Sequence, residues 1–339
     1  MRNSICIALV LLSTTYAHAK FERVTTLSHQ GMCEASAAVV LLQRSPEQLF
    51  VVANDEDNEL RVYSAEKAAG PIAKGDLSRH LGLDPDKKAD FEGATTLNGK
   101  IYWIASHSRN AEGEIRKQRW QFLSTTVAID EQTLKLSASS SSHDLLGEIA
   151  ALGKVFADAI QIDDRKSADL APENNGLNIE GLTVRADGKS MFIALRNPLS
   201  PEKKAFVIPL ENPEAVTERG EKPILGQPVP LDLGGRGIRS MEYSPEENAY
   251  FIIAGPNKDK GSFELYRWPG NAQEYPVVVE GAASEFAAID DFHPEAMFID
   301  TSGKVLHILS DDGDREIEPQ KACKKANDKS FRSFVFAIR

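Results

Sequence analysis

Four glutamates and one arginine occupy the same place in a phrase that recurs along the chain. These charged residues are Glu34, Glu92, Glu180, Arg239 and Glu295. Successive members are roughly 60 residues apart, except that the interval from Glu92 to Glu180 is longer by roughly 30 residues. If the repeat closes into a ring, these side chains face one another. Carboxylates gathered with a guanidinium are suited to binding a cation or to acid–base chemistry.

Carboxylates crowded around a narrow axis raise one another's pKa, so they need a counter-charge. Arg239 supplies one, and a bound cation would supply more. We expect Ca²⁺, which takes six to eight oxygen ligands in flexible geometry, whereas Mg²⁺ is less suited to an all-protein cage. The predicted metal ligands are Glu34, Glu92, Glu180, Glu295, Asp311 and Asp312. The alternative is that each glutamate caps backbone amides where two blades meet, with water filling the channel.

Each charged phrase is followed by an apolar run, a turn and a second apolar run, which is the pattern of a β-hairpin. Repeated hairpins predict an all-β fold, a β-propeller of five blades, or of six if the longer interval hides another unit. Strand 331–338 should pair with strand 21–28 and close the ring. Apolar residues at helical spacing from 145 to 160 predict a helical insertion over about 141–177, placed where it could cover the mouth of the channel.

Residues that follow the second strand of each hairpin should join the charged phrases at one mouth of the channel. They include Asn54, Asp55, His107, Arg109, Arg196, Asn197, Asp311 and Asp312. We predict His107, Glu92 and Glu180 as catalytic residues. We predict that substrate is bound by Arg109, Arg196, Arg236, Arg239 and Asn197. Alternatively, His107 is hydrogen-bonded without a catalytic role, and Arg236 and Arg239 pair with the glutamates.

The first 19 residues have the pattern of a secretory signal peptide. Arg2 precedes a short apolar run, and Ala17-His18-Ala19 fits a cleavage site. We therefore expect a single domain over 20–339, in the periplasm or secreted, with no later segment apolar enough to cross a membrane. The net charge of −11 argues against nucleic-acid binding. We expect a monomer that binds a small molecule, a glycan or a phosphoester.

Cysteine positions indicate a covalent tie between the ends of the ring. Cys6 leaves with the signal peptide, so Cys33 and Cys323 remain in an oxidising compartment. We predict a disulfide between them, with two buried thiols as the alternative.

Several stretches resemble a bacterial family, the domain of unknown function 3616. They are FEGATTLNGKIYWIASHSRN, NIEGLTVRADGKSMFIALRNPL, LDLGGRGIRSMEYSP, YFIIAGP, FHPEAMFID and ILSDDGD. The family is similar to phytase-like and esterase-like secreted propellers, and this resemblance implies calcium-supported hydrolysis of a phosphoester or an ester. It carries no catalytic residue to this chain. Our leading hypothesis is a metal-supported hydrolase, and the alternative is a propeller that binds a ligand or a protein without chemistry.

Overall fold

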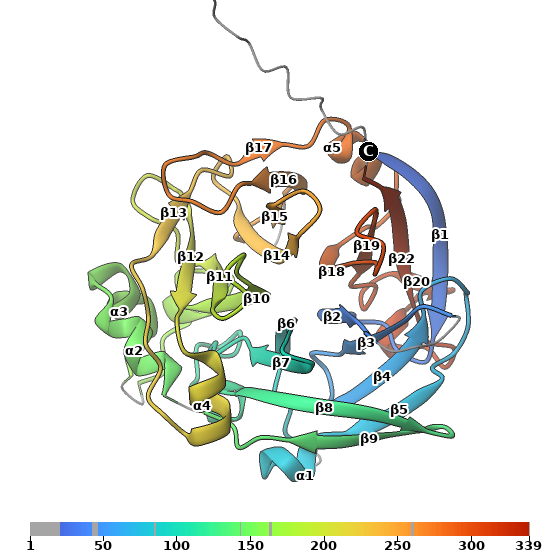
Figure 1. Cartoon of the computed structure of the whole chain (residues 1–339), viewed down its shortest axis with the longest axis horizontal. Coiled ribbons are helices and arrows are strands. Elements are labelled where there is room, and N and C mark those ends of the chain that lie inside the picture. The colour runs from blue at the N-terminus through green and yellow to red at the C-terminus, as the bar shows by residue number, and fades with distance from the viewer. Residues whose placement is uncertain are drawn as a thin grey trace, which may run out of the picture.

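Antiparallel sheets stand around a central axis (Figure 1). The structure is a computed structural model that describes residues 21–42, 47–84, 86–142, 144–162, 165–258 and 261–338. The predicted signal peptide, residues 1–19, lies outside the described residues. Sheets arranged radially about an axis form a β-propeller, the fold class that the repeated hairpins predict.

Three of the sheets in the described ranges contain four strands each, and each strand is hydrogen-bonded to the next one named. The first consists of β1 (Glu22–Gln30), β22 (Ser330–Ala337), β19 (Val305–Ser310) and β18 (Pro294–Ile299). The second consists of β10 (Asn178–Val184), β11 (Met191–Asn197), β12 (Ala205–Leu210) and β13 (Val229–Leu231). The third consists of β14 (Gly237–Ser244), β15 (Ala249–Gly255), β16 (Glu264–Trp268) and β17 (Val277–Val278). A short hairpin pairs β20 (Glu316–Glu318) with β21 (Lys321–Ala322).

A fourth large sheet has eight strands and is made of two antiparallel halves. One half contains β2 (Ala37–Val40), β3 (Leu49–Ala53), β4 (Glu59–Ser64) and β5 (Ala73–Asp76). The other contains β6 (Phe91–Leu97), β7 (Lys100–Ala105), β8 (Phe122–Asp130) and β9 (Thr133–Ala138). The halves meet through a parallel pairing in which Lys74 lies opposite Thr133. Glycine is needed at position 75 in this crossing, because a Cβ there would lie 2.5 Å from the Leu134 carbonyl oxygen.

The innermost strands form a closed circle. In order, β2, β6, β10, β14 and β18 each contact the next, and β18 contacts β2. As predicted, the sheet that contains β18 is completed by pairing a strand from each end of the chain, with Glu22 of β1 opposite Ala337 of β22. The predicted disulfide between Cys33 and Cys323 is confirmed, and it joins residues 290 positions apart in the sequence. Both the sheet edge and the covalent link therefore hold the ends of the chain together.

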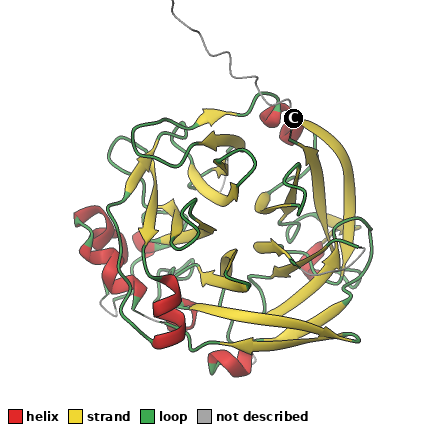
Figure 2. Cartoon of the chain, in the orientation of Figure 1, coloured by secondary structure: helices red, strands yellow, loops and turns green. Residues whose placement is uncertain are grey.

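Short helices lie at the outer edge of the circle of sheets, as Figure 2 shows. The α-helices are α1 (Ser78–Leu81), α2 (Leu145–Ala151), α3 (Lys154–Ile160), α4 (Pro213–Arg219) and α5 (Ala282–Ala287). Single 3-10 turns are formed by η1 (Lys117–Arg119), η2 (Ala168–Leu170) and η3 (Cys323–Lys325). None of the helices in the described ranges has the length and apolar character needed to span a bilayer.

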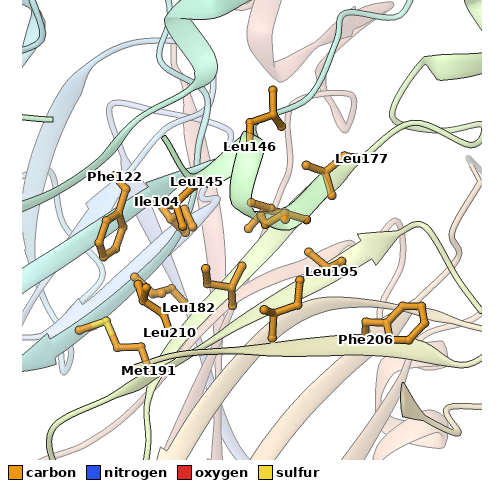
Figure 3. Close-up of a cluster of buried hydrophobic side chains, with 14 of the residues drawn as sticks. Ile104, Phe122, Leu145, Leu146, Leu177, Leu182, Met191, Leu195, Phe206 and Leu210 are labelled. Atoms are coloured by element: carbon orange, nitrogen blue, oxygen red, sulfur yellow. The ribbon is translucent and has the colours of Figure 1, made fainter. Parts of the chain in front are cut away.

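The helical insertion packs beside the ring. It contains two helices, α2 and α3, where the apolar spacing predicts one, because Gly153 with φ +149° interrupts the segment. Leu145 and Leu146 of α2 join a core cluster with residues of β7, β10 and β11 (Figure 3). In Figure 1 both helices lie at the outer edge, so they do not cover the central axis as a lid would.

Candidate functional site

The charged residue of four repeat phrases occupies a β-bulge in an inner strand. The pairing of β6 with β7 skips Glu92, and the corresponding pairings skip Glu180, Arg239 and Glu295. A bulge removes one residue from the ladder and re-aims its side chain. The repeated phrase is therefore a repeated bulge that turns one charged side chain per sheet toward its neighbours across the channel. Gly93 follows the first bulge because a Cβ there would lie 2.7 Å from the Leu182 amide nitrogen of the next inner strand.

The first phrase departs from this pattern. Glu34 precedes β2 and forms an isolated bridge with Asp311, which follows β19 of another sheet. The pairing of β2 with β3 runs from Ala37 without a register shift. Asp55, which follows β3, places a carboxyl close enough to Asp311 and Glu34 that their charges raise its pKa. We call Glu34, Asp55, Glu92, Glu180, Glu295 and Asp311 the carboxylate ring.

Arg239 holds one side of the carboxylate ring. Its Nε lies 3.0 Å from Glu180 Oε2, its Nη1 donates to Glu180 Oε1 at 3.2 Å, and its Nη2 contacts Glu295 Oε1. Arg196 adds a bond from Nη1 to Glu180 Oε1 at 3.1 Å. Burial raises the pKa of Glu180, while Arg239 and Arg196 lower it. Burial alone would lower the pKa of Arg239, but Glu180 and Glu295 hold it above its usual value. This arc is therefore charge-compensated.

The other arc of the ring has no ion pair of this kind in the described residues, although Arg239 and the Gly313 amide both lower the pKa of Asp311. Burial raises the pKa of Asp55 well above its usual value, and the charges of Asp311 and Glu34 raise it further. Burial likewise raises the pKa of Glu92, with contributions from nearby carboxylates, and that of Asp311, with Glu295 as the largest electrostatic contribution. Within the described part of the chain, Asp55, Glu92 and Asp311 form no ion pair, and Asp55 Oδ1 is buried without a hydrogen-bond donor.

Asp312 lies outside the carboxylate ring, although it is adjacent to Asp311. Its fully buried carboxylate accepts from Arg332 Nη2 at 2.7 Å and lies 3.3 Å from Arg315 Nε. Two arginines therefore account for its charge, and it ties the loop after β19 to β22. Its predicted role as a metal ligand has no support in these contacts.

His107 forms no hydrogen bond or ion pair with a ring carboxylate in the described residues. Its Nδ1 is 2.8 Å from the carbonyl oxygen of Ala105, and its backbone has φ +54°. The side chain lines a small cavity beside the helical insertion, together with Trp120 and Leu146. The geometry therefore does not bring His107 together with Glu92 and Glu180, the two carboxylates predicted to share its catalytic role.

The predicted substrate-binding arginines and asparagine are largely used by the protein itself. Arg109 donates to backbone carbonyls, including those of Gln161 at 2.6 Å and Arg165 at 2.7 Å, and so fastens the insertion to the ring. Asn197 Nδ2 donates to the carbonyl oxygens of Pro172 and Asn257 at 2.7 and 2.8 Å. Arg236 bonds Ser262 near the surface rather than the glutamates. Of this set, Arg196 and Arg239 reach the ring.

Sequence reasoning missed one polar group beside the ring. Asp90, at φ +64°, contacts the hydroxyl of Ser106 and lies 3.0 Å from Arg119 Nη1. Arg119 also donates to Ser108 Oγ at 2.7 Å. Asp90 precedes Glu92 by two residues, which is the one signal that could have pointed to it. The group gives Asp90 a counter-charge and fixes the two serines that flank His107.

The donor chemistry of the uncompensated arc suits a hard cation, because all of its groups are carboxylates. Among the described residues, however, no group of three or more His, Cys, Asp or Glu side chains is arranged so that it could hold a metal ion. A shared ion would thus require the carboxylates to change rotamer. The calcium site stays a prediction.

One family model matches the middle of the chain. Residues 130–290 match the family described as protein of unknown function (DUF3616). This confirms the resemblance stated from the sequence. The DUF3616 match includes Glu180 and Arg239 but not Glu92 or Glu295, so the compensated arc lies partly inside it. No curated protein matches the chain.

Solved structures similar to the chain are distant in sequence. Glutaminyl cyclase from Myxococcus xanthus is 10% identical, with 95% of this chain and 98% of that chain covered at a TM-score of 0.42. The Cps50 (Swd1) β-propeller domain of Myceliophteria thermophila is 10% identical, with 95% and 100% covered at a TM-score of 0.40. Hydrazine synthase from Kuenenia stuttgartiensis is 9% identical at a TM-score of 0.37, and the chain spans 56% of its length.

Proposed function

We propose that this protein is a periplasmic or secreted propeller that binds a cation at the carboxylate ring, with Ca²⁺ as the first ion to test. The observation that carries the proposal is the uncompensated arc. Asp55 and Glu92 come from the two halves of the eight-stranded sheet, and Asp311 follows β19 of another sheet. Burial and nearby carboxylates raise the pKa of all three, and none forms an ion pair within the described residues. A divalent cation would remove this electrostatic cost and would satisfy Asp55 Oδ1.

Calorimetric titration with Ca²⁺, paired with melting temperatures in Ca²⁺ and in chelator, tests this proposal. A ligand that binds only the folded state adds about 2.7 kcal/mol of stability at a free concentration about 100 times its Kd. Glu92→Gln should weaken binding by removing a ligand charge. Glu246→Gln, in the exposed turn after β14, is the matched control, since it removes the same charge from an exposed turn and should not affect Ca²⁺ affinity. The proposal is refuted if Ca²⁺ produces no heat of binding and no shift in melting temperature.

Hydrolysis of a phosphoester or an ester is the second candidate. It is favoured by the environment of Glu92, where burial and the nearby carboxylates raise the pKa of its carboxyl, the direction that a general acid requires. A bound cation would polarise the substrate oxygen. A panel of p-nitrophenyl phosphate and p-nitrophenyl esters tests it, and Glu92→Gln and Glu180→Gln should each abolish turnover. Saturable ligand binding without turnover would instead favour a propeller that binds without chemistry.

The proposed architecture and location rest on separate grounds. Counting each half of the eight-stranded sheet as one blade gives five blades around the circle of inner strands. The disulfide between Cys33 and Cys323 is the kind of bond that persists in an oxidising compartment. Fractionation of the native host followed by N-terminal sequencing of the mature protein tests the location, with a start near Lys20 as the expected result.

A further inference from the structure

A cavity of about 650 Å³ opens beside the carboxylate ring, on the face where the inner strands begin. Its walls come mainly from residues 256–258 and 261–263 after β15, from α5, and from the segment between α5 and β18. Part of the lining is apolar and includes Phe263, Phe286, Ile289 and Phe292. The volume lies within the range of pockets that enclose a small organic molecule.

This cavity also has basic side chains in its lining. It is lined by Arg196, Arg239 and Lys258, with one nearby carboxylate, Asp291, and one imidazole, His293. The negative partners of the two arginines, Glu180 and Glu295, are not among the residues that line the cavity. Cationic side chains therefore outnumber carboxylates among the lining residues, although both arginines are also paired with glutamates behind the wall.

Arg196 has hydrogen-bonding capacity left over. Its Nη1 donates to Glu180, but its Nη2 reaches the Lys258 carbonyl oxygen only at 3.4 Å. Its Nε is buried without an acceptor among the described residues. A buried guanidinium with weakly used donors gains from a further acceptor, which an anionic ligand would supply. Lys258 is exposed and forms no ion pair within the described ranges, so it can add a second cationic contact.

We propose that this cavity binds a small amphipathic anion, in which a carboxylate or phosphate head group meets Arg196, Lys258 and Arg239 and a single apolar body packs on Phe263 and Phe292. The site is separate from the proposed cation site, although Arg239 borders both. The enclosed volume favours a single-chain molecule over a lipid with two acyl chains.

Decanoate is the probe, titrated by calorimetry into the full mature protein in chelator, with decanol as the uncharged match and decyl phosphate as the second head group. We expect saturable binding of decanoate at one site and binding of decanol that is about tenfold weaker or more, because decanol lacks the charge. Raising the salt concentration should weaken decanoate binding. Decyl phosphate binding more tightly than decanoate would assign the head group as phosphate within the same proposal.

Variants locate the site. Lys258→Glu should weaken decanoate binding about tenfold, whereas Lys189→Glu, the same charge change in the turn between β10 and β11 at the opposite end of the sheet, should leave it unchanged. Phe263→Ala should also weaken it, and Phe263→Leu should retain most of the affinity because the apolar wall is kept. Absence of saturable binding, equal affinity for decanoate and decanol, or equal effects of the two lysine variants would each overturn the proposal. Loss of Ca²⁺ binding in a separate titration would not affect it.

Discussion

Glu242 offers the cleanest test of how burial controls charge in this fold. It lies on β14, and burial raises the pKa of its carboxyl to about 8, while a backbone hydrogen bond donated by Ile299 of β18 acts in the opposite direction. In the unfolded chain the pKa of a glutamate is about 4.3. The folded state therefore binds the proton more tightly than the unfolded state. The stability that this group contributes is fully present below about pH 4 and is lost as the pH rises through the folded value.

The size of the effect follows from the separation of the two pKa values. One pKa unit corresponds to about 1.4 kcal/mol, so at pH 7 the protonated folded carboxyl costs on the order of 3 kcal/mol relative to the ionised unfolded one. Glutamine has nearly the same shape and no proton to lose. Glu242→Gln should therefore raise the free energy of unfolding by on the order of 3 kcal/mol at pH 7, and by much less at pH 4.

Urea unfolding of the native protein and of Glu242→Gln at pH 4, 5.5, 7 and 8.5 measures this difference. Glu246→Gln, in the exposed turn that follows the same strand, is the matched control and should show no comparable gain at any pH. The two curves for Glu242→Gln and the native protein should separate progressively between pH 4 and pH 8. A gain of the same size at every pH would refute the reasoning, because it would show that the effect is unrelated to ionisation.

Three further outcomes are expected. Replacing Cys33 and Cys323 by serine should lower the free energy of unfolding by about 3–5 kcal/mol, measured in urea, because the bond closes a very long loop. Arg239→Met should cost about 3–5 kcal/mol at pH 8, since it leaves Glu180 buried without its main counter-charge, and the loss should shrink in the double variant with Glu180→Gln. Asp312→Asn should cost a similar amount at pH 7, whatever the Ca²⁺ concentration, because it leaves two arginines without their carboxylate.

The fold was predictable because its signals are local and repeated. Apolar alternation within each hairpin sets the strands, and the recurring charged phrase sets the period, so the ring and its closure by β1 and β22 follow from the sequence alone. The repeated charged phrase also predicted the side chains of the carboxylate ring, since Glu92, Glu180 and Glu295 each occupy the equivalent β-bulge of their own inner strand. Local chemistry of this kind needs no knowledge of distant neighbours.

Side-chain partners were much less predictable, and Asp311 and Asp312 show why. Adjacent residues of an extended chain point to opposite sides, so one carboxylate joins the ring and the other meets Arg332. To predict which of the two aspartates faces the carboxylate ring, one must know to within one residue how the segment after β19 is aligned with the neighbouring sheet. Arg109 is a second case, because it contacts the carbonyls of a segment more than 50 positions away. No periodicity encodes such a contact.

The single arginine among the repeat phrases divides the mouth of the channel into two electrostatic halves. Around Arg239 and Arg196 the charges cancel against Glu180 and Glu295, and Lys258 lies on the same cavity wall without an ion pair in the described residues. Around Glu92 the carboxylates raise its pKa, and Glu92 forms no ion pair in the described residues. The two halves favour ligands of opposite sign, so a cation on one side and an amphipathic anion on the other would not compete. Ligands of opposite charge bound so close together would also attract each other, and Ca²⁺ should therefore tighten the binding of decanoate rather than displace it.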